Sequence, residues 1–173
     1  AIEMDLAAQK EKNKIINKYR SLLRAGKDLI SKDDQRLVRS AFKLVANLNI
    51  DNRRESGDPY IFHLLDVARI CVEEIGLGTS SIIAALLHET IERKQLKFIE
   101  IEKRFGSTIA SIVDGFTKIS SLDPKDPKTQ AENFRQLLLT LSKDASVILI
   151  KLADRLETMR SLGSLDKEMQ LKR

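Results

Sequence analysis

Apolar residues recur three and four positions apart over most of this chain, which is the spacing of one face of an α-helix. Residues 33–48 show the pattern clearly, because Leu37, Val38, Phe42 and Val45 all fall on one side of a helix. No segment alternates apolar and polar residues for long enough to predict a strand, and no internal repeat is present. The sequence therefore predicts an all-α fold.

Capping and helix-breaking residues divide this pattern into separate helices. Gly, Asn, Asp and Pro gather in residues 49–59, which we expect to form the first long loop. Ser31 or Asp33 is expected to cap the second helix, and Thr79 or Ser80 the fourth. The expected helices cover residues 5–24, 33–48, 60–75, 82–94, 97–105, 107–120, 129–142 and 144–162, with a second break at 123–128.

Length and composition limit the class of protein. A chain of 173 residues is expected to form one domain. No apolar run approaches the roughly 18 to 20 residues that a membrane helix needs, and the N-terminus lacks the apolar segment of a signal peptide. The single cysteine, Cys71, cannot form an internal disulfide, so a cytoplasmic location without membrane contact is expected.

The charge balance favours an anionic ligand without identifying one. Thirty Lys and Arg face 25 Asp and Glu, which gives a net charge of +5. There is no block of five basic residues, no tryptophan and only two tyrosines, so a surface for stacking bases is not evident. We therefore expect no direct nucleic-acid binding.

The two histidines of the chain stand beside unusual neighbours. His88 follows an apolar run and has Glu89 next to it and Glu92 four positions on, the same face of a helix. Asp154 likewise follows an apolar run, and a carboxylate that leaves a core usually has a partner. A solvated helix end is the alternative interpretation. Nitrogen and oxygen ligands of this kind suit Mn²⁺, with Zn²⁺, Fe²⁺ and Mg²⁺ left open.

Four segments then occur in the order and approximate spacing of a known family. They are RRESGDPYIFH, AALLHETIE, FGSTIASIVDGFTKIS and LIKLADRLETMRSL, and they run from residue 53 to 162. Together they resemble the metal-dependent HD-type (p)ppGpp hydrolase domain of the RelA/SpoT family. The resemblance implies an HD-domain bundle of about eight helices over residues 1–173. It also implies an N-terminal fragment of a longer protein, with a covalently linked synthetase domain.

The resemblance assigns roles to particular residues. It implies that (p)ppGpp or a related guanine nucleotide loses its 3′-pyrophosphate here, with help from a bound metal ion. Glu92 matches an acid that helps to activate water, together with Glu89. The implied metal ligands are His63, His88, Glu89 and Asp154, and the implied nucleotide-binding positions are Arg54, Ser56, Tyr60, Lys151 and Thr158.

The chain departs from the family pattern at several of these positions. The HDxxED motif reads His88-Glu89-Thr90-Ile91-Glu92-Arg93, so a cation replaces the last acid. Arg93 is four positions after Glu89, the spacing at which opposite charges pair on a helix, so we expect it to draw the Glu89 carboxylate away from the metal. Other departures are Asn49, Glu55, Leu64, Glu157 and Thr158. Hydrolysis is therefore expected to be weakened or lost.

Two classes of function remain open on the sequence alone. The first is a (p)ppGpp 3′-pyrophosphohydrolase that keeps at least its metal site. The second is a non-hydrolytic regulatory or nucleotide-binding module of a RelA/SpoT (p)ppGpp synthetase. A general HD phosphohydrolase that acts on another nucleotide fits the RxSG and LADRL segments less well.

Overall fold

The computed structural model describes residues 2–120, 132–135 and 144–171, and every regular element in these ranges is helical. An isolated bridge between Arg53 and Pro59 closes the loop that follows the second helix. The prediction of an all-α fold is confirmed. The elements are α1 (Ile2–Ala25), α2 (Lys32–Leu48), α3 (Ile61–Ile70), the π-helical turn η1 (Cys71–Ile75), α4 (Thr79–Leu87), α5 (Phe98–Phe105), α6 (Ser107–Ser120) and α8 (Ser146–Leu171).

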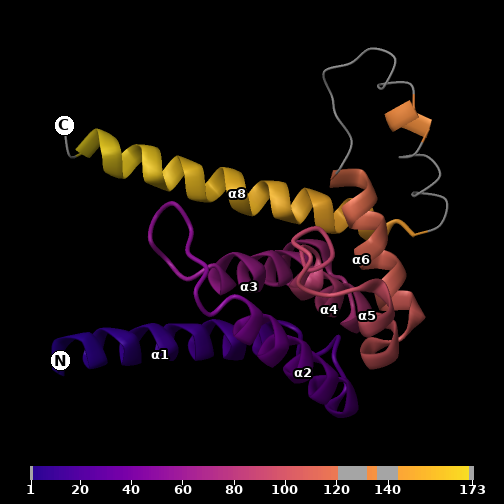
Figure 1. Ribbon diagram of the computed structural model, residues 1–173, viewed down its shortest axis with the longest axis horizontal. Helices are drawn as coiled ribbons and strands as arrows, with labels where there is room; N and C mark the ends of the chain where they lie inside the picture. Colours follow the sequence, from indigo (N-terminus) through magenta and orange to yellow (C-terminus); the bar gives the residue numbers. More distant parts are fainter. Residues whose placement is uncertain (1, 121–131, 136–143, 172–173) are drawn as a thin grey trace.

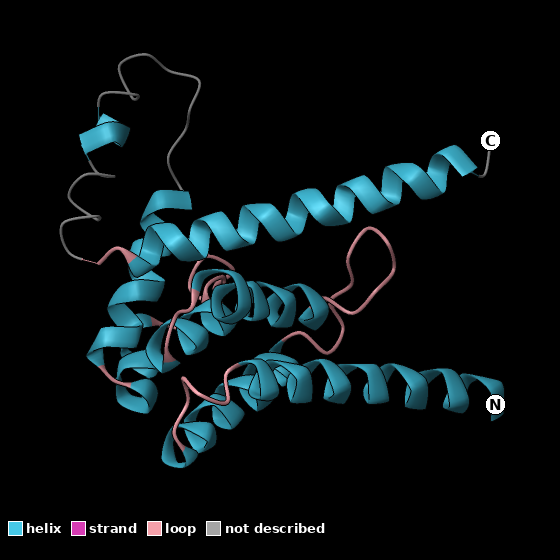
Figure 2. Cartoon of the chain, turned by 180° about the vertical axis from the view of Figure 1, so that it is seen from behind, coloured by secondary structure: helices cyan, strands magenta, loops and turns pink. Residues whose placement is uncertain are grey.

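The long helices α1 and α8 form two sides of the molecule, and α3 lies between them (Figure 1). Helix α3 contacts α1, α4 and α8, while α4 also packs against α2 and α6. The view from behind shows the same order, with both chain ends on one side (Figure 2). Because α3, α4 and α8 meet in the interior, residues far apart in sequence can share one site. No helix in the described ranges is both long and apolar enough to cross a membrane.

Helix α4 is the buried centre of the core. Its residues from Ile82 to Leu87 are all fully buried, as the uninterrupted apolar run predicts. Helix α6 packs against it and buries Ile112, Val113 and Phe116. The chain therefore leaves the middle of the core at His88.

The prediction that this helix continues to Lys94 is wrong, because α4 ends at Leu87. The Thr90 hydroxyl donates to the Leu87 carbonyl at 2.8 Å and takes up an acceptor that the helix would otherwise use. Lys94 has a φ of 59°, in the left-handed region, and ends the turns that follow. Glu89 and Arg93 therefore lie in a tight series of turns at the end of α4.

Two other boundaries differ from the sequence-based expectation. The expected helix 60–75 is α3 followed by η1, and it ends at Gly76, whose φ of 78° favours glycine. Neither Thr79 nor Ser80 caps α4: Gly78 is the N-cap, and the Thr79 hydroxyl donates to Asp34 of α2 at 3.1 Å. The expected helix 129–142 and the break at 123–128 lie mostly outside the described residues; residues 132–135 are helical.

Ser31 caps α2 as predicted, since its side chain accepts a hydrogen bond from the Asp34 backbone N–H at 3.2 Å. We expect Ser31→Ala to lower the free energy of unfolding by about 1 kcal/mol, the usual cost of losing an N-cap. Ser80→Ala is the matched control, because exposed Ser80 provides no cap, and its effect should stay within about 0.5 kcal/mol. Urea unfolding measures both values, and equal effects would contradict the assignment.

Candidate metal centre

Four side chains from three parts of the bundle converge in the interior. His63 comes from α3, His88 and Glu89 from the end of α4, and Asp154 from α8. Each offers one nitrogen or oxygen atom, and these atoms all lie within 4.8 Å of one another. The predicted convergence of His63, His88 and Asp154 is thus present, although Asp154 is 91 residues from His63.

The two histidines direct the same ring nitrogen into this group. Asp154 Oδ1 lies 2.9 Å from His63 Nε2 and 3.4 Å from His88 Nε2. Glu89 Oε1 lies 3.8 Å from His63 Nε2 and 3.6 Å from His88 Nε2. Two imidazole nitrogens and two carboxylate oxygens therefore surround one point, in an arrangement that suits a divalent cation.

His88 carries the clearest sign that the centre suits a metal ion. Its Nδ1 faces the Ala85 carbonyl, so this nitrogen carries the proton of a neutral ring and donates it. Its Nε2 is buried and has no hydrogen-bond partner among the described residues. The ring is held edge-on against Phe116, with 4.7 Å between the ring centroids. A fixed, buried nitrogen that faces two carboxylates and has no hydrogen-bond partner in the described chain fits a metal ligand.

The electrostatics of the centre also call for positive charge. Burial opposes ionisation of every group here, yet Asp154 and Glu89 raise the pKa of His88 to about 9. Burial likewise works against the Glu89 carboxylate, but the nearby His88 ring and the hydrogen bond from Tyr60 lower its pKa to about 2. The pKa of Asp154 is held well below its usual range, because the two histidines outweigh its burial. A proton or a metal cation must balance these carboxylates.

Tyr60 and Arg93 hold the far side of the Glu89 carboxylate. The Tyr60 hydroxyl donates to Glu89 Oε2 at 2.6 Å, and Arg93 Nε lies 3.2 Å from the same oxygen. The Arg93 guanidinium also stacks 4.0 Å above the Tyr60 ring. The expected pair of Arg93 and Glu89 is present, but it engages Oε2 and leaves Oε1 facing His63 and His88. Arg93 therefore holds Glu89 in place beside the histidines, whereas we expected it to draw the carboxylate away from the metal.

The centre opens onto a cleft of about 510 Å³, and His63, Glu89 and Asp154 are part of its wall. Lys151 is not part of the wall: its Nζ lies 3.8 Å from Asp154 Oδ2 and 5.0 Å above the Phe116 ring. Glu92 is exposed and lies outside the group of four. The remaining wall residues are Arg53, Arg54, Glu55, Ser56, Tyr60, Thr158, Ser161 and Leu162, which include four of the five predicted nucleotide contacts.

The role of Glu157 was missed in the sequence, where this residue reads only as a departure from the family pattern. It is 5% exposed and accepts hydrogen bonds from Arg54, from His63 Nδ1 at 2.9 Å and from Ser161 at 3.0 Å. Burial would raise its pKa, but His63 and Arg54 lower the pKa to about 2. Helical spacing holds a signal, because Glu157 is three residues after Asp154 and seven after buried Ile150.

Two other departures are structural. Leu64 is 2% exposed and belongs to the core. Asn49 is buried, donates to the Val45 carbonyl and accepts from Asn52, which fixes the start of the loop. Neither residue lines the cleft, so these two changes leave the site itself unaltered.

Comparison with known proteins agrees with this geometry. A family model described as an HD domain matches residues 41–173, which contain the whole metal centre. The chain is 38% identical over 135 residues to a guanosine-3′,5′-bis(diphosphate) 3′-pyrophosphohydrolase of Aquifex aeolicus (strain VF5). It is 37% identical over 158 residues to the bifunctional (p)ppGpp synthase/hydrolase SpoT of Escherichia coli (strain K12). These alignments cover 78% and 90% of this chain but 19% and 22% of the relatives, so the chain spans about a fifth of their length.

A solved structure is similar over most of the fold. It comes from a metazoan ortholog of SpoT that hydrolyzes ppGpp, with a TM-score of 0.59 and 28% sequence identity. The match covers 74% of this chain and 71% of that one. The family model, the relatives and the convergent His, Glu and Asp side chains agree: the chain belongs to the HD domain family, as an HD domain of the RelA/SpoT type.

Proposed function

We propose that this domain binds a divalent cation and removes the 3′-pyrophosphate of (p)ppGpp. The observation that carries the proposal is the convergence of His63, His88, Glu89 and Asp154 around one point, with a buried His88 nitrogen that has no partner in the described chain. The choice of substrate is supported by two relatives. One is named as a guanosine-3′,5′-bis(diphosphate) 3′-pyrophosphohydrolase, and the other as a bifunctional (p)ppGpp synthase/hydrolase.

We assign the cation to these four residues. His63 and His88 would each offer Nε2, and Glu89 and Asp154 would each offer an oxygen. When bound, such an ion acts as a Lewis acid toward a phosphoryl oxygen and lowers the pKa of a water molecule. Mixed nitrogen and oxygen ligands lead us to propose Mn²⁺. Neighbouring groups fix the orientation of two of these ligands. The Ala85 carbonyl orients the His88 ring, and Tyr60 and Arg93 orient the Glu89 carboxylate.

We place the nucleotide in the adjoining cleft. Arg54, Ser56 and Tyr60 stand on its wall beside the metal centre, where the Arg54 guanidinium can bind phosphate oxygens. The Ser56 and Tyr60 hydroxyls already donate to Asp58 and Glu89, and a bound nucleotide would have to take over these hydrogen bonds. Thr158 stands on the same wall, although its hydroxyl already donates to the Asp154 carbonyl at 2.9 Å. Lys151 would contribute positive charge from behind Asp154. Glu92, which is exposed, keeps its proposed role in activating water.

We further propose that hydrolysis is weak. Arg93 occupies the place of the last acid in the motif, and arginine cannot act as a base at neutral pH. The carboxylate of Glu55, on the cleft wall, repels phosphates. The same two residues favour the second candidate function, a non-hydrolytic module that binds the nucleotide and regulates a synthetase. Because the relatives are about four times as long, we propose that residues 1–173 form one N-terminal domain of such a longer protein.

An assay with Mn²⁺ and ppGpp tests this proposal. We expect release of GDP and pyrophosphate at less than about 1 per second, the low end of ordinary enzymes. EDTA should stop the reaction, and Asp154→Asn should abolish it, because that change removes a ligand oxygen. Turnover at about 10 per second would contradict weak hydrolysis. Binding of ppGpp without turnover would establish the second candidate, and absence of both would overturn the proposal.

A further inference from the structure

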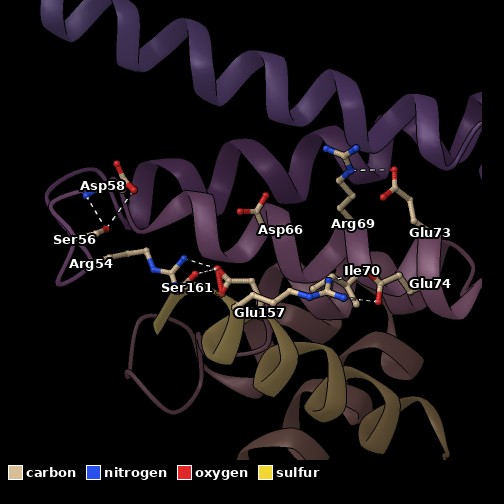
Figure 3. A pocket seen from close by; sticks show the side chains of 11 residues that line it. Arg54, Ser56, Asp58, Asp66, Arg69, Ile70, Glu73, Glu74, Glu157 and Ser161 are labelled. Carbon is tan, nitrogen blue, oxygen red and sulfur yellow. Dashed lines mark hydrogen bonds and ion pairs between the residues drawn. The ribbon is translucent and has the colours of Figure 1, made fainter. Parts of the chain in front are cut away.

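Glu157 stands between the metal centre and Arg54 and is fully hydrogen-bonded. Its Oε1 accepts from Arg54 Nη1 and from Ser161 Oγ, and its Oε2 accepts from Arg54 Nη2 at 3.0 Å and from His63 Nδ1 at 2.9 Å. Figure 3 shows the carboxylate facing the Arg54 guanidinium, with Ser161 beside them. Four donors match the four lone-pair positions of a carboxylate, so this side chain has one well-defined orientation.

The contact with His63 determines which nitrogen of that ring is free. A carboxylate can only accept, so the His63 nitrogen that faces Glu157 must carry a proton. The other nitrogen, Nε2, faces Asp154 and Glu89 and lies 2.9 Å from Asp154 Oδ1, so a cation that binds there takes the place of a proton and leaves Nδ1 as the protonated nitrogen of a neutral ring. A carboxylate that holds a histidine in this way orients it for a metal and increases its basicity.

The contact with Arg54 makes this buried charge possible. Glu157 is 5% exposed, and an unpaired carboxylate there would be costly, but the guanidinium meets it with two parallel hydrogen bonds. Both residues also line a second cleft of about 520 Å³, whose wall includes Glu74 (Figure 3), and Arg54 lines the metal-site cleft as well. Arg54 is therefore held at the edge of the metal-site cleft.

We propose that Glu157 is a positioning residue that links Arg54 to the metal ligand His63, and that it sets the imidazole tautomer needed for cation binding. The inference rests on the proposed metal site. Position 157 is one where this chain departs from the family pattern, so the link from Arg54 through Glu157 to His63 is a feature of this chain. Loss of the link should weaken cation binding without removing any ligand.

The test is Mn²⁺ affinity, measured by calorimetry on metal-free protein with Glu157→Gln. A glutamine has one acceptor oxygen, and the charged Arg54 should take it, which turns the amide N–H₂ toward His63 Nδ1 and favours the wrong tautomer. We expect affinity to fall at least about tenfold, as for other residues that orient metal ligands. Glu74→Gln is the matched control, because Glu74 also pairs with an arginine, Arg160, but is exposed and belongs neither to the metal centre nor to the wall of its cleft. Equal affinities of unmodified protein and Glu157→Gln would overturn the proposal.

A second measurement keeps the inference independent of metal binding. The chain has only two histidines, so ¹⁵N NMR of the imidazoles reports the His63 tautomer in metal-free protein. Burial works against a charged His63 ring, but hydrogen bonds to Asp154 and Glu157 outweigh burial and raise the pKa of His63, so the spectra are recorded at a pH above this pKa, where the ring is neutral. We expect protonated Nδ1 in the unmodified protein and a shift toward protonated Nε2 in Glu157→Gln. If the unmodified protein binds no Mn²⁺, the proposed function fails, and an unchanged tautomer would still overturn the role of Glu157. Should Glu157→Gln fail to fold, Glu157→Asp keeps the charge with a shorter reach and should lower Mn²⁺ affinity; unchanged affinity would also contradict the proposal.

Discussion

Replacement of His88 by asparagine is expected to weaken Mn²⁺ binding by more than about 100-fold, beyond the loss typical of residues that only orient a ligand. The change removes the buried nitrogen that has no partner within the described residues, and it leaves His63 as the one imidazole beside Asp154 and Glu89 in the group of four. Calorimetry measures the affinity. Thermal unfolding gives a second readout, because Mn²⁺ at 100 times its dissociation constant should stabilise the unmodified protein by about 2.7 kcal/mol.

Asp66→Asn is the control for this experiment. Asp66 is also a carboxylate of the bundle, but it pairs with Lys18 at 2.8 Å and lies outside the metal centre. It should keep the full stabilisation by Mn²⁺. His88 is buried against Phe116, so circular dichroism must first show that His88→Asn is folded. A folded His88→Asn protein with undiminished Mn²⁺ affinity would remove His88 from the metal site.

The convergence of His88 and Asp154 could be predicted because it follows from the apolar residues that precede each of them in the sequence. His88 and Asp154 each follow an apolar run, and such runs are buried whatever the details of the fold. A polar residue at the end of a buried helix must then lie near the interior, where it needs a partner. For His63 the argument was weaker, and its place in the centre came from the family resemblance. The all-α fold was equally accessible, since helical periodicity extends over most of the chain.

The end of α4 and the role of Glu157 depend on contacts that the spacing of apolar and polar residues does not reveal. Helical spacing continues past Leu87, and only the Thr90 hydroxyl bond to the Leu87 carbonyl and the left-handed Lys94 reveal the turns. Glu157 meets His63 and Arg54 across 94 and 103 residues of sequence. A single sequence does not show which arginine will neutralise which buried acid.

The sequence also could not show how Arg93 acts on Glu89, and the contact in the structure differs from the one expected. Helical spacing correctly predicted that Arg93 and Glu89 would pair, but spacing cannot say which carboxylate oxygen is used. Tyr60 decides it, because its ring supports the guanidinium and its hydroxyl takes the same oxygen, Oε2. Glutamate at position 89 and arginine at position 93 thus form one unit with Tyr60, and we expect their effects on the site to be non-additive.

Changing Glu89→Asp and Arg93→Asp together is therefore expected to raise ppGpp turnover by about 100-fold, the low end of what a positioned acid or base contributes. The double change restores the acid that the family motif has and removes the cation that Glu89 and Tyr60 hold beside the centre. Arg93→Asp alone should gain less, because it places two carboxylates four positions apart and leaves Glu89 without its brace. Glu89→Asp alone should also gain little, since aspartate is shorter and Arg93 would remain next to it.

Single-turnover kinetics with Mn²⁺ and ppGpp separate this effect from product release, and kcat should rise while KM changes little. Arg104→Asp is the matched control for the change in charge, because Arg104 is an exposed arginine of α5 outside the cleft. Arginine can also stabilise negative charge on a transferring phosphoryl group. If the double variant is slower than the unmodified protein, Arg93 takes that second role and the site is not weakened. The Arg93 side chain is 37% exposed and already contacts Tyr60 and Glu89. Its guanidinium would have to leave both partners to reach a phosphate. We therefore expect the double variant to be faster than the unmodified protein.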